Sequence, residues 1–268
     1  MLANRLKVVI ILIPVGVGLI VVGGWAYTAL VALMLAVAAW EYWRMFNRGG
    51  IRVNAWVLLP GVVLLVITRA VWQFAYSDLI LGGLVLAAMT AHTIWCERGC
   101  KTPATDFGAT VGGLVYIGLI GSYLISLRQL PGGMWWLLLA IPAISIGDSG
   151  AFFIGRKFGR RPLAPVVSPN NTVEGLIGGI VFTILGGWLL AYLWSLRYPL
   201  MTPWHGLILG AVLGLLTPLG DLGESMLKRQ FGVKDTSGIL PGHGGVLDRM
   251  DSWIWGGVIS YYVITLLF

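Results

Sequence analysis

Residues 225–251 read SMLKRQFGVKDTSGILPGHGGVLDRMD and lie between two strongly apolar segments. With the four residues before it, this region holds five acidic and four basic side chains. A carboxylate costs about 2.5–3.5 kcal/mol at the centre of a bilayer on insertion scales. A mostly apolar chain that keeps such a dense group of carboxylates is therefore expected to use them.

The composition predicts an all-α polytopic integral membrane protein. Of the 268 residues, 57% are hydrophobic and only 11% are charged, whereas a soluble domain carries about 25% charged residues. Apolar segments long enough to span a bilayer, some of them short for a full span, predict about nine transmembrane helices. They lie at 8–24, 26–40, 54–69, 79–95, 108–127, 134–147, 175–195, 205–220 and 252–268.

The basic residues predict the orientation of these helices. With the N-terminus in the cytoplasm and the C-terminus outside, 15 of the 18 basic residues fall on the cytoplasmic side, as the positive-inside rule requires. The net charge of +7 is thus mostly a matter of topology, and it faces anionic headgroups. We expect no nucleic-acid partner.

Two polar helical faces flank a glycine-rich turn. The first face repeats at helical spacing and comprises Asp221, Glu224, Ser225, Lys228 and Arg229. The second comprises Asp248, Asp251 and Ser252. Residues 238–245 between them contain four glycines and a proline, so they are predicted to turn sharply. The two acidic faces are therefore expected to meet at the membrane surface.

This arrangement predicts a metal and phosphate site. Mg²⁺ takes one or two carboxylates together with substrate phosphates, and Asp221 and Asp248 fit that role. Asp251 or Glu224 completes the set, and Asp148, which ends an apolar segment on the same side, is also predicted as a ligand. The bases Lys228, Arg229, Lys234 and Arg249 would offset the charge of a bound triphosphate. The alternative is a set of salt bridges at helix ends.

A second polar loop, 148–174, emerges on the same predicted side. Ser168, Asn171 and Thr172 could donate hydrogen bonds to phosphate or pyrimidine edges where the next helix starts. Alternatively, Ser168 or Thr172 caps that helix, with Glu174 in its first turn. His243 is either a general base, a turn-forming residue or a phosphate contact.

The string 225–251 resembles the signature of the phosphatidate cytidylyltransferases, also called CDP-diacylglycerol synthases. Its elements here are Ser225, Lys228-Arg229, Lys234-Asp235, His243-Gly244-Gly245, Asp248-Arg249 and Asp251. The segments 220–224 and Asp148-x-x-Ala151 also look like this family. The resemblance covers about 147–268, and the N-terminal half agrees only in having several spans.

The resemblance implies conversion of phosphatidate and CTP to CDP-diacylglycerol and pyrophosphate, with Mg²⁺ and a second cation such as K⁺. The catalytic residues it implies are Asp221, Asp248, Lys228, Arg229 and Arg249. The metal ligands are Asp221, Asp248, Asp251, Glu224 and Asp148. The substrate-binding residues are Ser168, Asn171, Thr172, Glu174, Ser225, Lys234, His243, Gly244 and Gly245. One departure is Asn171, where the family usually has Lys. Its loss could weaken triphosphate binding, shift the donor, or be offset by Lys157 or Arg161.

On this basis we divide the chain into two regions. Residues 1–107 are predicted to form transmembrane helices that serve as scaffold, lipid access or a dimer face. Residues 108–268 form the predicted catalytic region, with cytoplasmic loops 148–174 and 221–251. We expect a homodimer in the cell (inner) membrane, with its active site at the cytoplasmic face.

Two rival functions remain. A transporter with an interfacial ion site would want ionisable residues near mid-span, yet every acid except Asp78 is predicted near a cytoplasmic span end. Another CTP-dependent lipid enzyme, such as a polyprenol kinase or an isoprenoid-ether cytidylyltransferase, would share the metal and nucleotide chemistry and differ in its lipid pocket.

Overall fold

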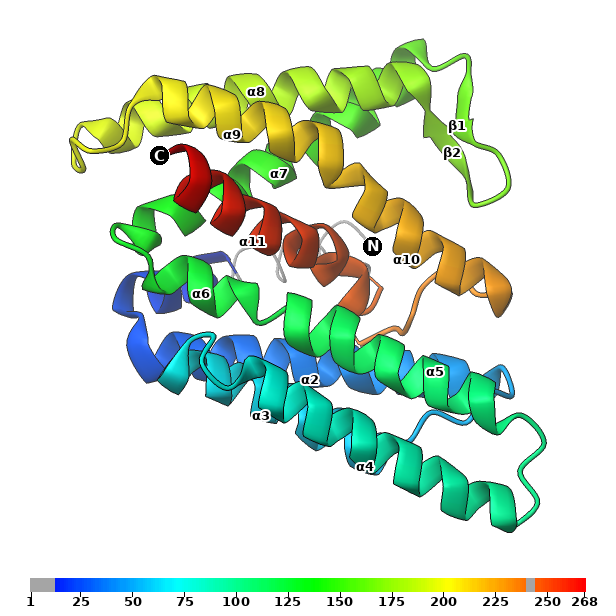
Figure 1. The fold of residues 1–268 in the computed structure, drawn as a ribbon. Helices are drawn as coiled ribbons and strands as arrows, with labels where there is room; N and C mark the ends of the chain where they lie inside the picture. The colour runs from blue at the N-terminus through cyan, green and yellow to red at the C-terminus, as the bar shows by residue number, and fades with distance from the viewer. Residues whose placement is uncertain (1–12, 240–243) are drawn as a thin grey trace. The chain divides into compact units, whose positions relative to one another are not determined.

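The computed structural model describes residues 13–239 and 244–268 and is almost entirely helical (Figure 1). Its chain forms two compact units. Unit 1 comprises residues 1–126 and 231–250, and unit 2 comprises residues 127–230 and 251–268. Each unit is described by itself below.

Unit 1 is a group of long apolar helices. After the helical segment Ile13–Val22, it contains α2 (Gly24–Arg48), α3 (Ala55–Trp72), α4 (Ser77–Glu97), α5 (Pro103–Gly113) and the π-helix η1 (Leu114–Ile120). The helix α6 (Tyr123–Gln129) runs into unit 2. Leu35, Leu58, Val62, Leu114 and Ile117 are fully buried in its core. Asn54 begins α3 by accepting hydrogen bonds from the backbone N–H groups of Trp56 and Val57, as an N-cap residue does.

Unit 2 consists of long helices and a small hairpin. It contains α7 (Gly133–Phe158), β1 (Pro162–Ala164), β2 (Ser168–Thr172), α8 (Val173–Ser195), α9 (Pro203–Leu216) and α10 (Pro218–Gln230). It also holds α11 (Leu247–Leu267) from Asp251 onward. The helix α8 packs against both α7 and α9. In Figure 1, α8 and α9 run side by side, and the antiparallel strands β1 and β2 follow the end of α7.

The helices confirm an all-α polytopic membrane protein. Seven helical stretches within the described residues are long and apolar enough to cross a membrane. They are Gly24–Arg48, Ala55–Trp72, Ser77–Glu97, Pro103–Gln129, Gly133–Phe158, Val173–Ser195 and Pro203–Gln230. The first predicted segment is described only over Ile13–Val22, and the last corresponds to α11, which is outside these seven. The count of nine and the orientation of the termini stay predictions.

The predicted start of the loop at residue 148 is wrong, because α7 extends to Phe158. Residues 148–158 continue α7, which is 26 residues long and not a short span. Two glycines of α7 in this region allow close packing against α8. A Cβ on Gly147 would lie 2.0 Å from Thr183 Oγ1, and one on Gly150 would lie 2.4 Å from Phe182 Cγ. The irregular part of this region is the hairpin that follows Phe158.

Candidate functional site

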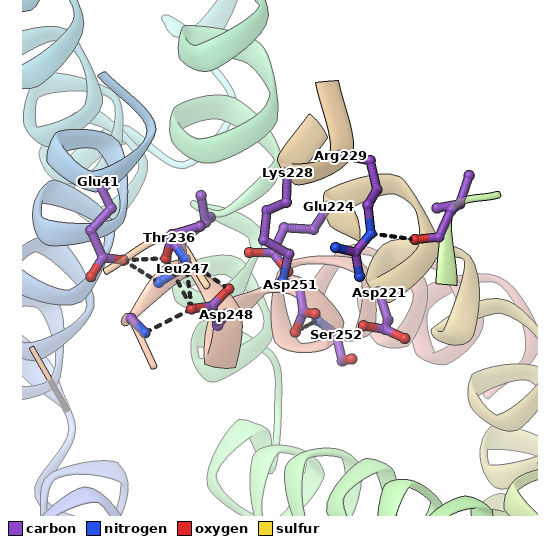
Figure 2. A network of polar contacts seen from close by, with 12 residues as sticks. Glu41, Asp221, Glu224, Lys228, Arg229, Thr236, Leu247, Asp248, Asp251 and Ser252 are labelled. Atoms are coloured by element: carbon purple, nitrogen blue, oxygen red, sulfur yellow. Dashed lines mark hydrogen bonds and ion pairs between the residues drawn. The ribbon is translucent and has the colours of Figure 1, made fainter. Parts of the chain in front are cut away.

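Three carboxylates converge in unit 2. Asp221 and Glu224 share one face of α10, and Asp251 lies one turn into α11 (Figure 2). One oxygen from each of the three lies within 4.8 Å of the others. Glu224 is 1% exposed and Asp251 is 6% exposed. Asp221 is half-buried. Carboxylates this close repel each other when they are ionised, and a bound cation would relieve that repulsion.

A glycine permits the close approach of α10 and α11 at this point. A Cβ on Gly220 would lie 2.5 Å from Trp255 Cδ1 and 3.1 Å from the backbone oxygen of Asp251. The absence of a side chain at Gly220 therefore lets the next residue, Asp221, come near Asp251. The helical spacing predicted for 221–229 and for 248–252 is confirmed by α10 and α11.

A lysine is paired with this group in the described part of the chain. Lys228 Nζ forms an ion pair with Glu224 Oε2 at 2.7 Å, and both residues are buried. Asp148 on α7 also acts electrostatically on Asp251. Asp221, Glu224 and Asp251 each offer a carboxylate oxygen to the same small region. Oxygen donors with excess negative charge are the ligands that a hard divalent cation prefers, so the residues present fit such an ion.

The β-hairpin lies against α10. Asn171 Nδ2 donates to Asp221 Oδ2 at 3.1 Å, and Arg229 Nε donates to the backbone oxygen of Val167 at 3.1 Å. Asn171 therefore contacts one of the three converging carboxylates. Ser168 lies at the start of β2 and is half-buried.

The start of α8 confirms the capping alternative for Thr172. Its Oγ1 accepts a hydrogen bond from the backbone N–H of Gly175 at 3.1 Å. Glu174 Oε2 accepts from the backbone N–H groups of Arg160 and Arg161 at 3.0 and 3.2 Å. Glu174 therefore ties the chain after α7 to the start of α8. Substrate-binding roles for Thr172 and Glu174 stay predictions.

Asp248 lies in a different network, within unit 1. Its carboxylate accepts from Thr236 N and Oγ1 at 3.0 and 3.1 Å, and from Gly245 N at 2.7 Å. Figure 2 shows these contacts as dashed lines. The partner of Asp221 within unit 2 is thus Asp251, and a metal-binding role for Asp248 stays a prediction.

The other predicted residues have varied surroundings. Ser225 is buried on α10, Lys234 and Arg249 are exposed, and Gly244 lies beside Asp248. His243 lies outside the described residues.

Sequence reasoning missed Glu41. This residue of α2 is fully buried, and its carboxylate lies within hydrogen-bond reach of Thr236, Ser237, Val246 and Leu247. The predicted segment 26–40 ended one residue before it, whereas α2 extends to Arg48. A single acid inside an apolar helix was the available signal.

Comparison with known proteins extends the similarity over nearly the whole chain. The profile of the cytidylyltransferase family matches residues 3–267. The chain belongs to this family. The match includes the N-terminal half, where the signature residues gave no resemblance.

Three relatives of this chain are all described as phosphatidate cytidylyltransferases. A phosphatidate cytidylyltransferase of Synechocystis sp. is 30% identical, over 98% of this chain and 97% of the relative. A phosphatidate cytidylyltransferase of Bacillus subtilis is 34% identical, over 92% of each chain. A third, from Staphylococcus epidermidis, is 41% identical over 53% of each chain.

Proposed function

We propose that this chain transfers CMP from CTP to phosphatidate and releases CDP-diacylglycerol and pyrophosphate. Family membership and relatives of nearly equal length support this activity. The structural observation that carries it is the convergence of half-buried Asp221 with buried Glu224 and Asp251. A transferase acting on a triphosphate needs such a group to hold cations against its substrate's phosphates.

The proposed cofactor is Mg²⁺, with K⁺ as a second cation. Asp221, Glu224 and Asp251 would hold the divalent ion, and Asp148 and Asp248 are proposed as further ligands. A bound divalent cation would offset the negative charge between the α- and β-phosphates of CTP. Three converging carboxylate oxygens supply the hard, negatively charged donors that this role requires.

The chemistry needs no nucleophile from the protein. An oxygen of the phosphatidate phosphate forms a bond to the α-phosphorus of CTP. The bond from that phosphorus to the bridging oxygen of the β-phosphate breaks, and pyrophosphate leaves. The chain contributes positioning and charge. We assign the contacts to the departing phosphates to Lys228, Arg229 and Arg249, with Lys234 nearby in sequence.

The substrates constrain the location of the site. Phosphatidate keeps its acyl chains in the bilayer and CTP stays in water, so the phosphates must meet at headgroup level. We propose that this is the cytoplasmic face of the cell (inner) membrane and that the protein works as a homodimer. The basic residues on the predicted cytoplasmic side support the orientation.

The deciding experiment uses purified protein in detergent with phosphatidate, Mg²⁺ and CTP labelled at the α-phosphate. We expect label in the lipid phase and release of unlabelled pyrophosphate. Transfer of label from γ-labelled CTP would instead indicate a kinase. Label found only in free CMP or remaining in CTP, with correctly folded protein, would exclude the proposed transfer.

A further inference from the structure

Glu41 on α2 contacts Thr236, Ser237, Val246 and Leu247, which lie 195 to 206 residues later in the sequence. Its Oε1 accepts from Ser237 Oγ and from the backbone N–H of Val246 at 3.0 Å. Its Oε2 accepts from Thr236 Oγ1 at 3.3 Å and from the backbone N–H of Leu247 at 2.7 Å. All five residues belong to unit 1.

Glu41 accepts hydrogen bonds from several donors of the protein itself. An ionised carboxylate offers about four lone-pair sites. Ser237 Oγ and the backbone N–H groups of Val246 and Leu247 donate to Glu41, and the Thr236 hydroxyl lies within reach of it. Glu41 is 0% exposed. A buried carboxylate is costly unless it is hydrogen-bonded, and here Thr236, Ser237, Val246 and Leu247 supply the donors.

Glu41 also supports the start of α11. The N–H groups at a helix start lack partners within the helix, and negative charge is favourable there. Leu247 is the first residue of α11, and its N–H and that of Val246 both donate to Glu41. Asp251 follows one turn later in the same helix.

Asp248 binds the same region as Glu41, because it accepts hydrogen bonds from Thr236 and Gly245. The Thr236 hydroxyl has one hydrogen and lies within reach of both Glu41 Oε2 and Asp248 Oδ2. The two carboxylates thus share one donor. Glu41 also accepts from Ser237 Oγ and two backbone N–H groups, and Asp248 also accepts from the backbone N–H groups of Thr236 and Gly245. We define the carboxylate clamp as Glu41, Asp248 and their donors Thr236, Ser237, Gly245, Val246 and Leu247.

We propose that Glu41 is a positioning residue. It holds Thr236, Ser237 and the start of α11 in the geometry that metal binding requires. The inference rests on the proposed function and gives the N-terminal helices one definite role, that of scaffold. Glu41 acts through the residues it holds and not on the substrate.

The test compares Glu41→Gln and Glu41→Asp with wild type and with Glu97→Gln, an exposed acid at the end of α4. The Gln variant keeps the volume but turns two acceptor sites into a donor group, while the Asp variant keeps the carboxylate. Hydrogen–deuterium exchange in detergent, without substrates, reports on residues 244–250. We expect exchange there to rise at least tenfold in Glu41→Gln, less in Glu41→Asp, and not at all in Glu97→Gln.

Kinetics then separate positioning from folding. Per folded molecule, kcat should fall at least tenfold in Glu41→Gln, and the Mg²⁺ concentration for half-maximal rate should rise. Glu41→Asp should recover part of both. A purely structural role would lower the folded fraction and leave both parameters at their wild-type values, which would overturn the proposal.

A milder variant keeps the inference testable if Glu41→Gln does not fold. Ser237→Ala removes one of the four donors and leaves the carboxylate in place, so we expect a two- to fivefold change in the same directions. Unchanged exchange and unchanged Mg²⁺ dependence in this variant would contradict the clamp. If wild-type protein makes no CDP-diacylglycerol, the proposed function fails, while the exchange measurement still tests whether Glu41 holds the segment.

Discussion

Asn171 Nδ2 donates a hydrogen bond to Asp221 Oδ2 at 3.1 Å. The amide therefore orients one oxygen of Asp221. The same carboxylate belongs to the converging group with Glu224 and Asp251. The resemblance described above leads one to expect a lysine at this position, whereas this chain holds Asp221 with a neutral donor. The group therefore keeps more negative charge than a lysine would leave it.

The first prediction concerns this neutral donor. Asn171→Ala removes a hydrogen bond to a charged group, worth about 1.5 kcal/mol at the lower end of its usual range. We expect the Mg²⁺ concentration for half-maximal rate to rise about tenfold. Asn171→Lys should raise it as well, because its cation competes with the metal for Asp221, but it should lower the KM for CTP. Equal KM values for CTP in Asn171→Lys and Asn171→Ala would contradict this account.

A second prediction concerns the metal directly. Asp251→Asn and Asp221→Asn each remove one of three converging charges, so Mn²⁺ or Mg²⁺ binding, measured by calorimetry without substrates, should weaken. Turnover should fall at least about 100-fold, since even the outer partners of metal ligands cost about 10–100-fold. The control is Asp78→Asn, an exposed acid in the first turn of α4, which should leave both measurements unchanged. Wild-type metal affinity in Asp251→Asn would exclude the site.

A third prediction concerns Asp248, which accepts hydrogen bonds from Thr236 and Gly245. Asp248→Asn keeps the shape and halves the accepting capacity, so we expect it to abolish metal-dependent turnover while the protein still inserts and folds. Circular dichroism and gel filtration check the fold, and the lipid-label assay checks turnover. Near wild-type activity would count against both the metal-binding and the clamp roles of this residue.

The sequence was sufficient to predict the polar helical faces. Spacings of three and four residues among charged side chains identified the faces of α10 and α11, because a helix places such residues on one side. Composition alone identified an all-α membrane protein, since only 11% of residues are charged. Both predictions depend on local periodicity or on totals, and neither requires knowledge of which helices meet.

Tertiary contacts could not be predicted in this way. Residues 148–158 were predicted to begin a loop, but α7 continues through them, and Gly147 and Gly150 leave room for the close approach of α8. Glu41 escaped notice because its donors lie near residue 240 in the sequence. Within unit 2, Asp251 of α11 comes near Asp221 and Glu224. The sequence spacing did not show which acid of α11 this would be, and the metal-binding role of Asp248 stays a prediction. The functional boundary at 107/108 stays a prediction.

A fourth prediction concerns Gly245 and its small size. A Cβ at Gly245 would lie 2.2 Å from Thr236 Oγ1 and 2.6 Å from Glu41 Oε1. Gly245→Ala should therefore displace the clamp and destabilise the fold by about 1–3 kcal/mol, as overpacking does. Gly108→Ala is the matched control, because Gly108 lies in α5 with nothing within 4 Å of an added Cβ. That change should be neutral or stabilise by up to about 1 kcal/mol. Equal unfolding midpoints for the two variants would contradict the packing around Glu41.

The last prediction separates stability from catalysis at the ion pair of Lys228 and Glu224. Lys228→Met removes the cation that lies 2.7 Å from a buried carboxylate, and breaking a buried pair from one side costs about 3–5 kcal/mol. The double variant Lys228→Met/Glu224→Gln removes both charges, so at least half of the lost stability should return. Turnover should not return, because Glu224 is one of the proposed metal ligands and Lys228 one of the proposed phosphate contacts. Chemical unfolding in detergent and the lipid-label assay measure the two effects on the same samples. Additive losses of stability, with a coupling below about 0.5 kcal/mol, would show that the pair is not the source of stability, and recovered turnover would remove Glu224 from the proposed ligands.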